Sequence, residues 1–211
     1  MNDRVLRGGE IVVASGNAGK LAELRGLLAD LPLSLRRQSE FGVAPPPETG
    51  LTFVENALIK ARSASEQTGL PAIADDSGLE VDALGGAPGV RSARFAQDAG
   101  AGAAPADADA ANRAQLRRLM RAVPTGRRAA RFHCVLVLLR HPGDPVPILA
   151  QGHWEGELLE EERGEGGFGY DSLFFVPSHN ASAAELAAPV KNALSHPAVA
   201  ARRLRELLVG A

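Results

Sequence analysis

The stretch EIVVASGNAGKLAELRGLLA, residues 10–29, changes its periodicity halfway and thereby decides the fold class. Residues 10–15 are a short apolar run, which is typical of a buried strand. In residues 18–29 the leucines recur at helical spacing, so a helix is expected directly after the strand. Strand and helix patterns go on alternating through the first half of the chain, and a long strand pair follows. This order predicts an α/β protein with a mixed sheet and flanking helices.

The other expected elements follow from the same two periodicities and from the turn signals between them. The expected strands are apolar runs bounded by turn residues, at residues 33–37, 71–75, 129–140, 148–157 and 173–176. The two long strands should form an antiparallel hairpin. The expected helices have apolar positions at helical spacing, at residues 52–68, 109–123 and 195–209. Thr52 with Glu55 matches a capping box, and Ser195 is expected to cap the last helix.

Composition and charge narrow the class of protein. The 211 residues, 45% hydrophobic and 23% charged, fit a single α/β domain of two lobes over 1–211, in which about residues 1–10 form a flexible N-terminal extension. No apolar run is long enough for a membrane helix and no signal-peptide core opens the chain, so we expect no membrane association. The single cysteine, Cys134, lies in an apolar run; it fits a core position and a reducing, cytoplasmic location. A net charge of −2 argues against nucleic-acid binding.

The turn inside the opening stretch, SGNAGK, has the composition of a phosphate-binding loop. Ser15 and Asn17 can hydrogen-bond phosphate oxygens, helix-start N–H groups favour an anion, and Lys20 adds a positive charge. It is not the common P-loop, because Leu21 follows the lysine where that motif has Ser or Thr. An ordinary strand-to-helix turn with a surface lysine remains an alternative.

Polar residues also surround the helix expected at 52–68. Glu48 precedes it, and Asn56 and Lys60 are four residues apart, so they share one helix face. A carboxylate and a lysine placed in this way could bind a metal ion and a phosphate. The alternative is an amphipathic helix with a solvated face.

Asp75 and Asp76 come at the expected end of the strand at residues 71–75, directly before Ser77. The carboxyl ends of strands in an α/β sheet are common ligand sites, and paired carboxylates suit magnesium. The alternative is an acidic turn, although paired acids beside a buried strand are costly unless they are compensated.

A glycine-rich segment, GEGGFGYDSLFF, and the later KNALSHPA form the fourth polar group. Glycines let the backbone approach a flat ligand, on which Phe168 or Tyr170 could stack. Hydrogen bonds to a base could come from Asp171, Lys191, Ser195 and His196. A β-bulge and a helix cap are the alternative.

Other chemistries find little support in the sequence. The five histidines show no zinc-ligand spacing with the cysteine, and no nucleophilic triad is visible. Asp107 and Asp144 lie in loops rich in alanine or proline and are expected to be solvated turn residues.

Six strings, taken together and in order, resemble the inosine triphosphate pyrophosphatases, also called noncanonical purine nucleoside triphosphate pyrophosphatases. They extend over nearly the whole chain: ASGNAGKLAEL, ETGLTFVENALIKAR, PAIADDSGLEVDALGGAPGVRSARFA, ARFHCVLVLLR, GEGGFGYDSLFFVP and AAELAAPVKNALSHPA. The resemblance implies hydrolysis of ITP, dITP and XTP to the monophosphate and pyrophosphate, which removes deaminated purines from the nucleotide pool. It also implies a need for Mg²⁺, a homodimer, and two lobes with a deep active-site cleft between them.

The resemblance assigns roles residue by residue. The triphosphate loop matches residues Ser15, Gly16, Asn17, Ala18, Gly19 and Lys20. Lys60 matches a second phosphate lysine, Glu48 and Asp76 match metal-binding carboxylates, and Asp76 also matches the proton acceptor, with Asp75 beside it. Ser77 matches a substrate contact. The base-binding positions match residues Phe168, Gly169, Tyr170, Asp171, Lys191 and His196.

One position departs from the family pattern in a way that bears on specificity. The family has Ser-His-Arg where this chain has Ser195, His196 and Pro197. Proline is tolerated in a first helical turn, but the five donors of an arginine are lost, so discrimination against ATP should weaken unless Arg202 or Arg203 compensates. Two other functions stay open: a related Maf-type pyrophosphatase acting on other nucleotides, and a nucleotide-binding module without turnover.

Overall fold

The computed structural model describes residues 9–15, 21, 24–26, 28–100 and 107–210. Residues 1–8 of the predicted extension at about 1–10 lie outside the described residues. The chain divides into two compact units. The first unit contains Met1–Asp76, Cys134–Gly152 and Ser195–Ala211. The second unit contains Ser77–His133 and His153–Leu194.

The described residues form a mixed sheet in the strand order β2-β1-β3-β4-β5-β6-β7. The strands are β1 (Glu10–Ala14), β2 (Ser34–Arg37), β3 (Ala72–Val81), β4 (Ala129–Leu139), β5 (Ile148–Leu158), β6 (Phe174–Val176) and β7 (Ala181–Ser182). β1 pairs in parallel with β2 and β3, whereas β6 pairs antiparallel with β5 and β7. The predicted mixed α/β sheet is therefore confirmed.

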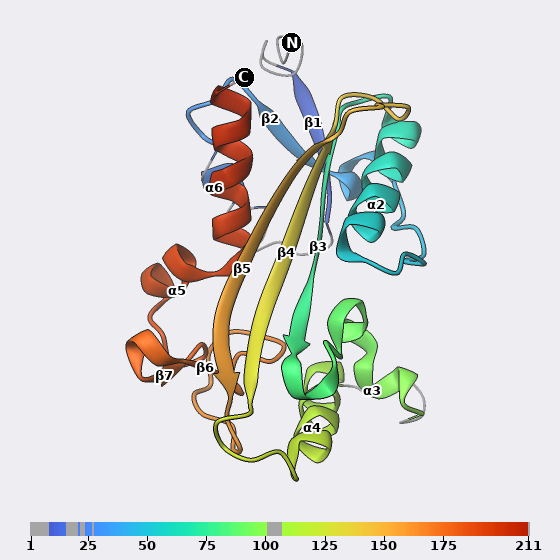
Figure 1. The fold of residues 1–211 in the computed structure, drawn as a ribbon. Coiled ribbons are helices and arrows are strands. Elements are labelled where there is room, and N and C mark those ends of the chain that lie inside the picture. The colour runs from blue at the N-terminus through green and yellow to red at the C-terminus, as the bar shows by residue number, and fades with distance from the viewer. Residues whose placement is uncertain (1–8, 16–20, 22–23, 27, 101–106, 211) are drawn as a thin grey trace. The chain divides into compact units, whose positions relative to one another are not determined.

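The helices of the described residues are of two kinds. The α-helices are α2 (Phe53–Thr68), α3 (Phe95–Asp98), α4 (Ala108–Met120), α5 (Ala188–Leu194) and α6 (His196–Val209), drawn in Figure 1. Short 3-10 helices are η1 (Gln38–Phe41), η2 (Asp82–Leu84), η3 (Gly89–Arg94) and η4 (Pro177–His179). None of the described helices is both long and apolar enough to cross a membrane.

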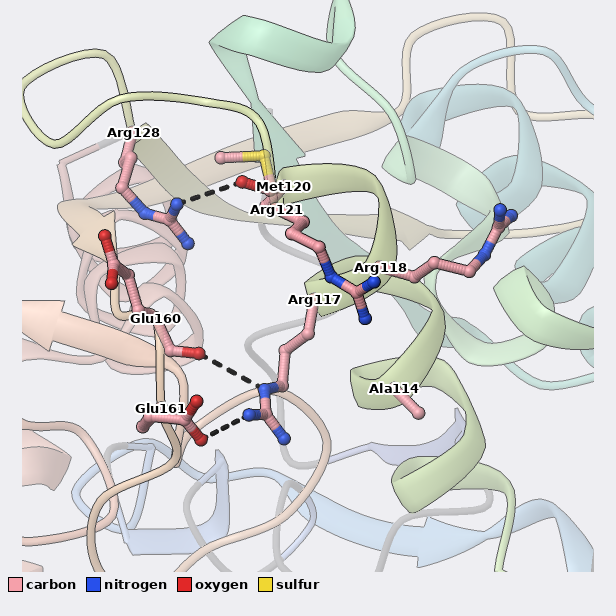
Figure 2. Close-up of a pocket in the computed structure, with 8 residues that line it drawn as sticks. All are labelled: Ala114, Arg117, Arg118, Met120, Arg121, Arg128, Glu160 and Glu161. Carbon is pink, nitrogen blue, oxygen red and sulfur yellow. Dashed lines mark hydrogen bonds and ion pairs between the residues drawn. The ribbon is translucent and has the colours of Figure 1, made fainter.

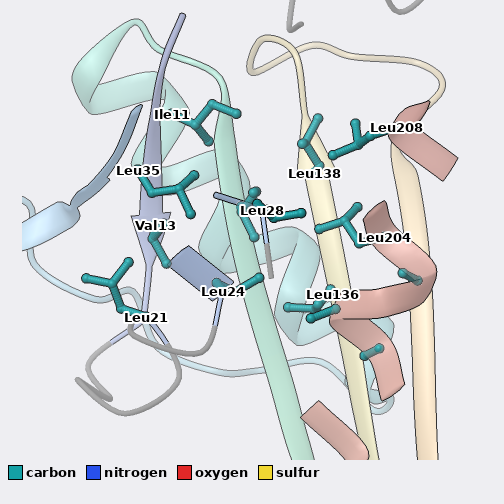
Figure 3. Close-up of a cluster of buried hydrophobic side chains, with 14 of the residues drawn as sticks. Ile11, Val13, Leu21, Leu24, Leu28, Leu35, Leu136, Leu138, Leu204 and Leu208 are labelled. Carbon is teal, nitrogen blue, oxygen red and sulfur yellow. The ribbon is translucent and has the colours of Figure 1, made fainter. Parts of the chain in front are cut away.

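The two faces of the first unit's strands are filled by different helices, because side chains alternate along a strand. Ile11 and Val13 of β1 pack with leucines of the segment after β1 and of α6 (Figure 3). Val12 and Ala14 instead pack with alanines of α2, whose small side chains let the helix lie close to the sheet. The second unit has its own core, in which Phe174 contacts the rings of Phe132 and Trp154.

Several predicted elements agree closely with the structure. Thr52 caps α2, and both hydrogen bonds of the capping box with Glu55 are present. The N–H of Leu158, the last residue of β5, donates to the carbonyl of Arg128, directly before β4, at 2.8 Å, as expected for an antiparallel hairpin. Residues 44–50 have no regular structure. In the helix expected at 18–29, the described residues 21 and 24–26 are helical.

Other predictions need correction. The strand expected at residues 71–75 is present, but its predicted end is wrong, since β3 continues through both aspartates to Val81, with Leu79 and Val81 buried in the second core. The helix expected at 109–123 ends at Met120 and begins after Asp107, whose carboxylate caps it by accepting from the N–H of Ala110. Ser195 precedes α6 as expected, but its side chain makes no capping bond. The sequence analysis missed α5 and β7, which are short.

Asp144 is also not the solvated turn residue that the sequence suggested. It is 3% exposed, forms an ion pair with Arg140, and accepts from the N–H groups of Arg140 and Val146 at 3.0 Å each. Its carboxylate thus organises the turn between β4 and β5 from inside. The predicted core position of Cys134 is confirmed at 1% exposure.

Candidate active site

Two carboxylates and one lysine of the first unit meet in what we call the carboxylate–lysine centre: Glu48, Lys60 and Asp76. The Lys60 Nζ atom lies 2.8 Å from Glu48 Oε1 and 2.8 Å from Asp76 Oδ1. Asn56, one turn before Lys60 on α2, donates from Nδ2 to Asp76 Oδ2 at 3.2 Å. The expected shared face of Asn56 and Lys60 is confirmed, and it is directed at Asp76.

Local structure places the three groups. The capping box fixes the residue at which α2 begins, and this determines the positions of Asn56 and Lys60 along the helix. The N–H of Gly50 donates to Asn56 Oδ1 at 2.8 Å, which ties the loop that carries Glu48 to the helix. A Cβ atom at residue 50 would lie 2.6 Å from the Cβ of Glu55, so only glycine allows this close approach.

The strand geometry distinguishes the two aspartates. Alternating residues of β3 point to opposite faces of the sheet, and Ala72 and Ala74 face α2. Asp76 continues that series and so faces Asn56 and Lys60, whereas the pleat directs Asp75 to the other face. The sequence left the choice between these aspartates open; the geometry favours Asp76 as the group that acts with Lys60.

Burial governs the electrostatics of the centre. Asp75 and Asp76 are each 7% exposed. Burial raises the pKa of Asp76 above its usual range, and this outweighs the opposing effects of Lys60 and Asn56. For Lys60, burial acts to lower the pKa, but the negative charges of Asp76 and Asp75 outweigh it and the pKa is raised. Lys60 therefore remains a cation, next to a carboxylate that is more basic than usual.

The donor set of the centre fits a magnesium ion. Both carboxylates reach the same ammonium group, so their oxygens are at most two hydrogen-bond lengths apart. Magnesium takes oxygen ligands and is commonly bound by one or two carboxylates together with water and substrate phosphates. Among the described residues, no group of three or more Asp, Glu, His or Cys side chains could hold a metal ion, so Glu48 and Asp76 would hold it as a pair.

The remaining first-unit predictions are only partly within the described residues. Ser15 directly follows β1 and is half-buried. The rest of the predicted phosphate loop, Gly16, Asn17, Ala18, Gly19 and Lys20, lies outside the described residues. His196 and Pro197 are the first two residues of α6, so the helix accepts the proline as expected. Arg203, one of the two arginines that could compensate for Pro197, donates to the carbonyl of Gln151 in β5 at 2.7 Å.

The second unit brings together most of the predicted base-binding residues. Lys191 Nζ lies 2.5 Å from Asp171 Oδ2 and 5.3 Å from the centroid of the Phe168 ring. The same carboxylate oxygen accepts from the N–H of Phe168 at 2.8 Å. Gly167 has φ +78°, and a Cβ atom there would lie 2.2 Å from Asp171 Oδ2. The glycine thus makes room for the acid–lysine pair.

The two aromatic residues of this loop have different environments. Phe168 is 62% exposed, so one ring is free to contact a flat ligand. Tyr170 is 4% exposed, and its hydroxyl donates to the carbonyl of Ser92 at 2.8 Å. Burial raises the pKa of Tyr170, which stays protonated. The stacking role that the sequence offered to either ring therefore suits Phe168, while Tyr170 anchors the loop.

Ser77 follows Asp76 in β3 and is half-buried. The sequence analysis missed Asp109 and Arg113 of α4, which hydrogen-bond to Gly169. Their spacing, an acid four residues before a base, is the signal of a shared helix face.

A cavity of about 440 Å³ in the second unit contains none of the predicted site residues (Figure 2). Arg117 donates to the carbonyl of Glu160 and pairs with Glu161. Arg128 donates to the carbonyls of Leu158, Leu159, Met120 and Val123. These two arginines hold the segment after β5 to the end of α4, which is a structural role.

Fold and site together define a mixed-sheet α/β protein with a buried centre suited to phosphate and to a hard cation, and with a separate loop suited to a flat polar ligand. The chain belongs to the Ham1 family, whose model matches residues 11–207.

Named relatives extend over almost the same length. A dITP/XTP pyrophosphatase of Xanthomonas campestris pv. campestris is 59% identical over 198 residues, 94% of this chain and 96% of the relative. One from Vibrio parahaemolyticus is 52% identical over 195 residues, 92% of this chain and 94% of the relative. Among solved structures, a HAM1 protein from Coxiella burnetii superposes with a TM-score of 0.88 at 48% identity, covering 96% of this chain and 99% of that one.

Proposed function

We propose that this chain is a nucleoside-triphosphate pyrophosphatase that hydrolyses dITP, XTP and ITP to the monophosphate and pyrophosphate, and so removes deaminated purines from the nucleotide pool. The carboxylate–lysine centre is the observation that carries the proposal, because it places Asp76, whose pKa is raised, beside the positively charged Lys60. The relatives named dITP/XTP pyrophosphatase support the substrate class.

In the proposed reaction, Asp76 accepts a proton from the attacking water. The water oxygen forms a bond to the α-phosphorus, the bond from this phosphorus to the α,β-bridging oxygen breaks, and pyrophosphate leaves. The raised pKa of Asp76 makes it a better proton acceptor than an exposed aspartate. Lys60, together with Lys20 of the predicted phosphate loop, stabilises the charge that develops on the leaving group.

Glu48 and Asp76 are proposed to hold Mg²⁺, which would supply charge neutralisation on the triphosphate oxygens. The triphosphate would also contact the predicted loop from Ser15 to Lys20, and Ser77 would contact the substrate. We assign base recognition to Phe168, Gly169, Asp171, Lys191 and His196, with Tyr170 anchoring their loop. These roles rest on the family resemblance and on the donors and acceptors that the residues offer.

Three further features complete the proposal. The family resemblance supports a cleft between two lobes of a single domain and a homodimer. A reducing, cytoplasmic location fits the single, buried Cys134.

A product assay tests this function. The purified protein is incubated with Mg²⁺ and, separately, dITP, XTP, ITP, GTP or ATP, and pyrophosphate and orthophosphate are quantified. Pyrophosphate from dITP, XTP and ITP, with little from GTP and ATP, is the expected result. Tight nucleotide binding without pyrophosphate would favour a binding module, and preference for pyrimidine nucleotides in a wider panel would favour a Maf-type enzyme.

The assay also addresses Pro197. Release of pyrophosphate from all five nucleotides would preserve the mechanism and place a loss of discrimination at this position. A Pro197→Arg variant should then recover selectivity by about tenfold, since a hydrogen bond lost at a base edge costs about 1–3 kcal/mol. Equal selectivity of the two proteins would mean that the loss of discrimination does not arise at Pro197.

A further inference from the structure

Helix α4 holds the peptide groups on both sides of Gly169. Asp109 Oδ2 accepts from the N–H of Gly169 at 2.7 Å, and Arg113 donates from a terminal nitrogen to the carbonyl of Gly169 at 3.0 Å. The two side chains are four residues apart, so they project from one face of the helix. Arg113 is itself held by Glu162, whose carboxylate lies 2.7 Å from Nε.

This pair links α4 to the loop tip that carries Phe168. The neighbouring anchors attach elsewhere: the N–H of Phe168 donates to Asp171, and the Tyr170 hydroxyl donates to Ser92. Gly169 has φ +61° and contacts no atom where a Cβ would be, so packing does not define its conformation. The hydrogen bonds that Gly169 makes, donating to Asp109 and accepting from Arg113, do so instead.

We propose that Asp109 and Arg113 are positioning residues that fix the Gly169 peptide groups, and through them the Phe168 ring and the Asp171 carboxylate, in the arrangement that distinguishes one purine base from another. The inference rests on the proposed function for its substrate. Neither side chain need touch the nucleotide: both act through the backbone of the loop.

The physical reason is preorganisation. The loop has glycines at 164, 166, 167 and 169, each with a wide choice of backbone conformations. A loop that must be ordered by the ligand weakens binding, whereas a loop held in advance does not. We call Asp109 and Arg113, with their hydrogen bonds to Gly169, the clamp. Loss of the clamp should raise KM and reduce selectivity, while kcat, which depends on the carboxylate–lysine centre, changes little.

Asp107 provides a matched control. It lies two residues earlier and caps α4 through the N–H of Ala110, without a hydrogen bond to the loop. Asp107→Ala and Asp109→Ala each remove one carboxylate from the start of the same helix. Asp109→Asn keeps an oxygen that can accept from Gly169 and should restore much of the wild-type behaviour.

The test measures kcat and KM for dITP and for GTP in the wild type and these three variants. For Asp109→Ala we expect the KM for dITP to rise about tenfold, the preference for dITP over GTP to fall by a similar factor, and kcat to stay within about twofold. Asp107→Ala should keep the wild-type selectivity. Equal KM and selectivity in both alanine variants would overturn the proposal.

Hydrogen exchange in the nucleotide-free protein provides a readout that does not depend on activity. The Gly169 amide should exchange about tenfold faster in Asp109→Ala than in wild type. In Asp107→Ala its exchange rate should equal that of the wild type. Unchanged exchange in Asp109→Ala would refute the clamp even if the protein hydrolyses dITP. Conversely, faster exchange in a protein that releases no pyrophosphate from any purine nucleotide would establish the clamp and reject the proposed function.

Discussion

The ammonium group of Lys60 donates hydrogen bonds to both Glu48 and Asp76, and these two bonds determine the chemistry of the centre. Three acidic residues, including Asp75, lie near one lysine, so the centre keeps an excess of negative charge. That excess favours a divalent cation, and a bound cation would offset the repulsion between the carboxylates and an incoming triphosphate. Lys60 opposes the rise in the pKa of Asp76 that burial causes, but does not cancel it.

Replacing the proposed proton acceptor should separate activity from folding. In Asp76→Asn, the amide retains an oxygen that can accept from Lys60 or Asn56, but it cannot take a proton from water. We expect kcat to fall about a thousandfold, the middle of the usual range for a general base, with an unchanged circular dichroism spectrum.

Asp82→Asn is the control for this change, since Asp82 is an exposed aspartate that pairs with Arg131. It should keep wild-type turnover. Substantial activity in Asp76→Asn would remove Asp76 from its role and return the choice to Asp75.

Asp144 should make stability depend on pH. Its hydrogen bonds with Arg140, together with those from backbone N–H groups, hold the pKa of Asp144 below its usual range despite burial. An acid with a depressed folded-state pKa contributes stability above its unfolded pKa and loses it as pH falls through the folded value. Asp144→Asn should therefore lower the free energy of unfolding by about 2 kcal/mol at pH 7, with a difference that narrows below about pH 4.

Urea unfolding of wild type and Asp144→Asn at several pH values measures this difference. Asp98→Asn removes surface ion pairs with Arg91 and Arg94 and should cost less than about 0.5 kcal/mol. A difference for Asp144→Asn that stayed constant from pH 7 to pH 3 would contradict the assigned cause.

At the scale of secondary structure, β5 and α6 approach each other closely at Gly152. A Cβ atom there would lie 2.2 Å from the carbonyl oxygen of His196 and 2.5 Å from the nitrogen of Ala200. Both are backbone atoms, so the helix itself would have to move. We expect Gly152→Ala to lower the free energy of unfolding by at least about 2 kcal/mol.

Gly143→Ala is a control of equal chemistry, because the nearest atom to its added Cβ is 3.9 Å away. Thermal unfolding of the two variants compares them directly. Equal melting temperatures would show that α6 adapts to the added methyl group without cost.

The sequence predicted the elements that are specified by local signals. Helix α2 begins where its capping box predicts, and β1, β2 and β6 match their apolar runs within a residue or two. β3 was predicted to end at its aspartates because buried acids are costly in isolation. The side chains that compensate Asp76 come from α2, 16 and 20 residues earlier in the chain. Such tertiary contacts are not visible in a local pattern.

The same distinction applies to the site. Residue types and spacing offered Glu48 with Lys60, and Asp75 with Asp76, as two separate candidate groups. The family resemblance joined Glu48, Lys60 and Asp76, and the structure brings these three into contact. The sequence could not separate Asp75 from Asp76, because that choice depends on which face of β3 is covered by α2. Nor could it assign Tyr170 to an anchoring role, since the acceptor, Ser92, is 78 residues away.

For the whole molecule, the resemblance to a dimeric family gives a direct expectation. Light scattering should give a mass twice that of the 22.0 kDa chain, at concentrations used for the activity assay. The mass of a single chain, in a sample with full pyrophosphatase activity, would show that the dimer is not needed for function.

The position of bond cleavage tests the central claim most directly. Hydrolysis of dITP in water labelled with ¹⁸O, followed by mass spectrometry of both products, shows which phosphorus is attacked. Water positioned by Asp76 for the α-phosphorus predicts the label in the monophosphate and none in the pyrophosphate. Label in the pyrophosphate, or release of orthophosphate, would contradict the account.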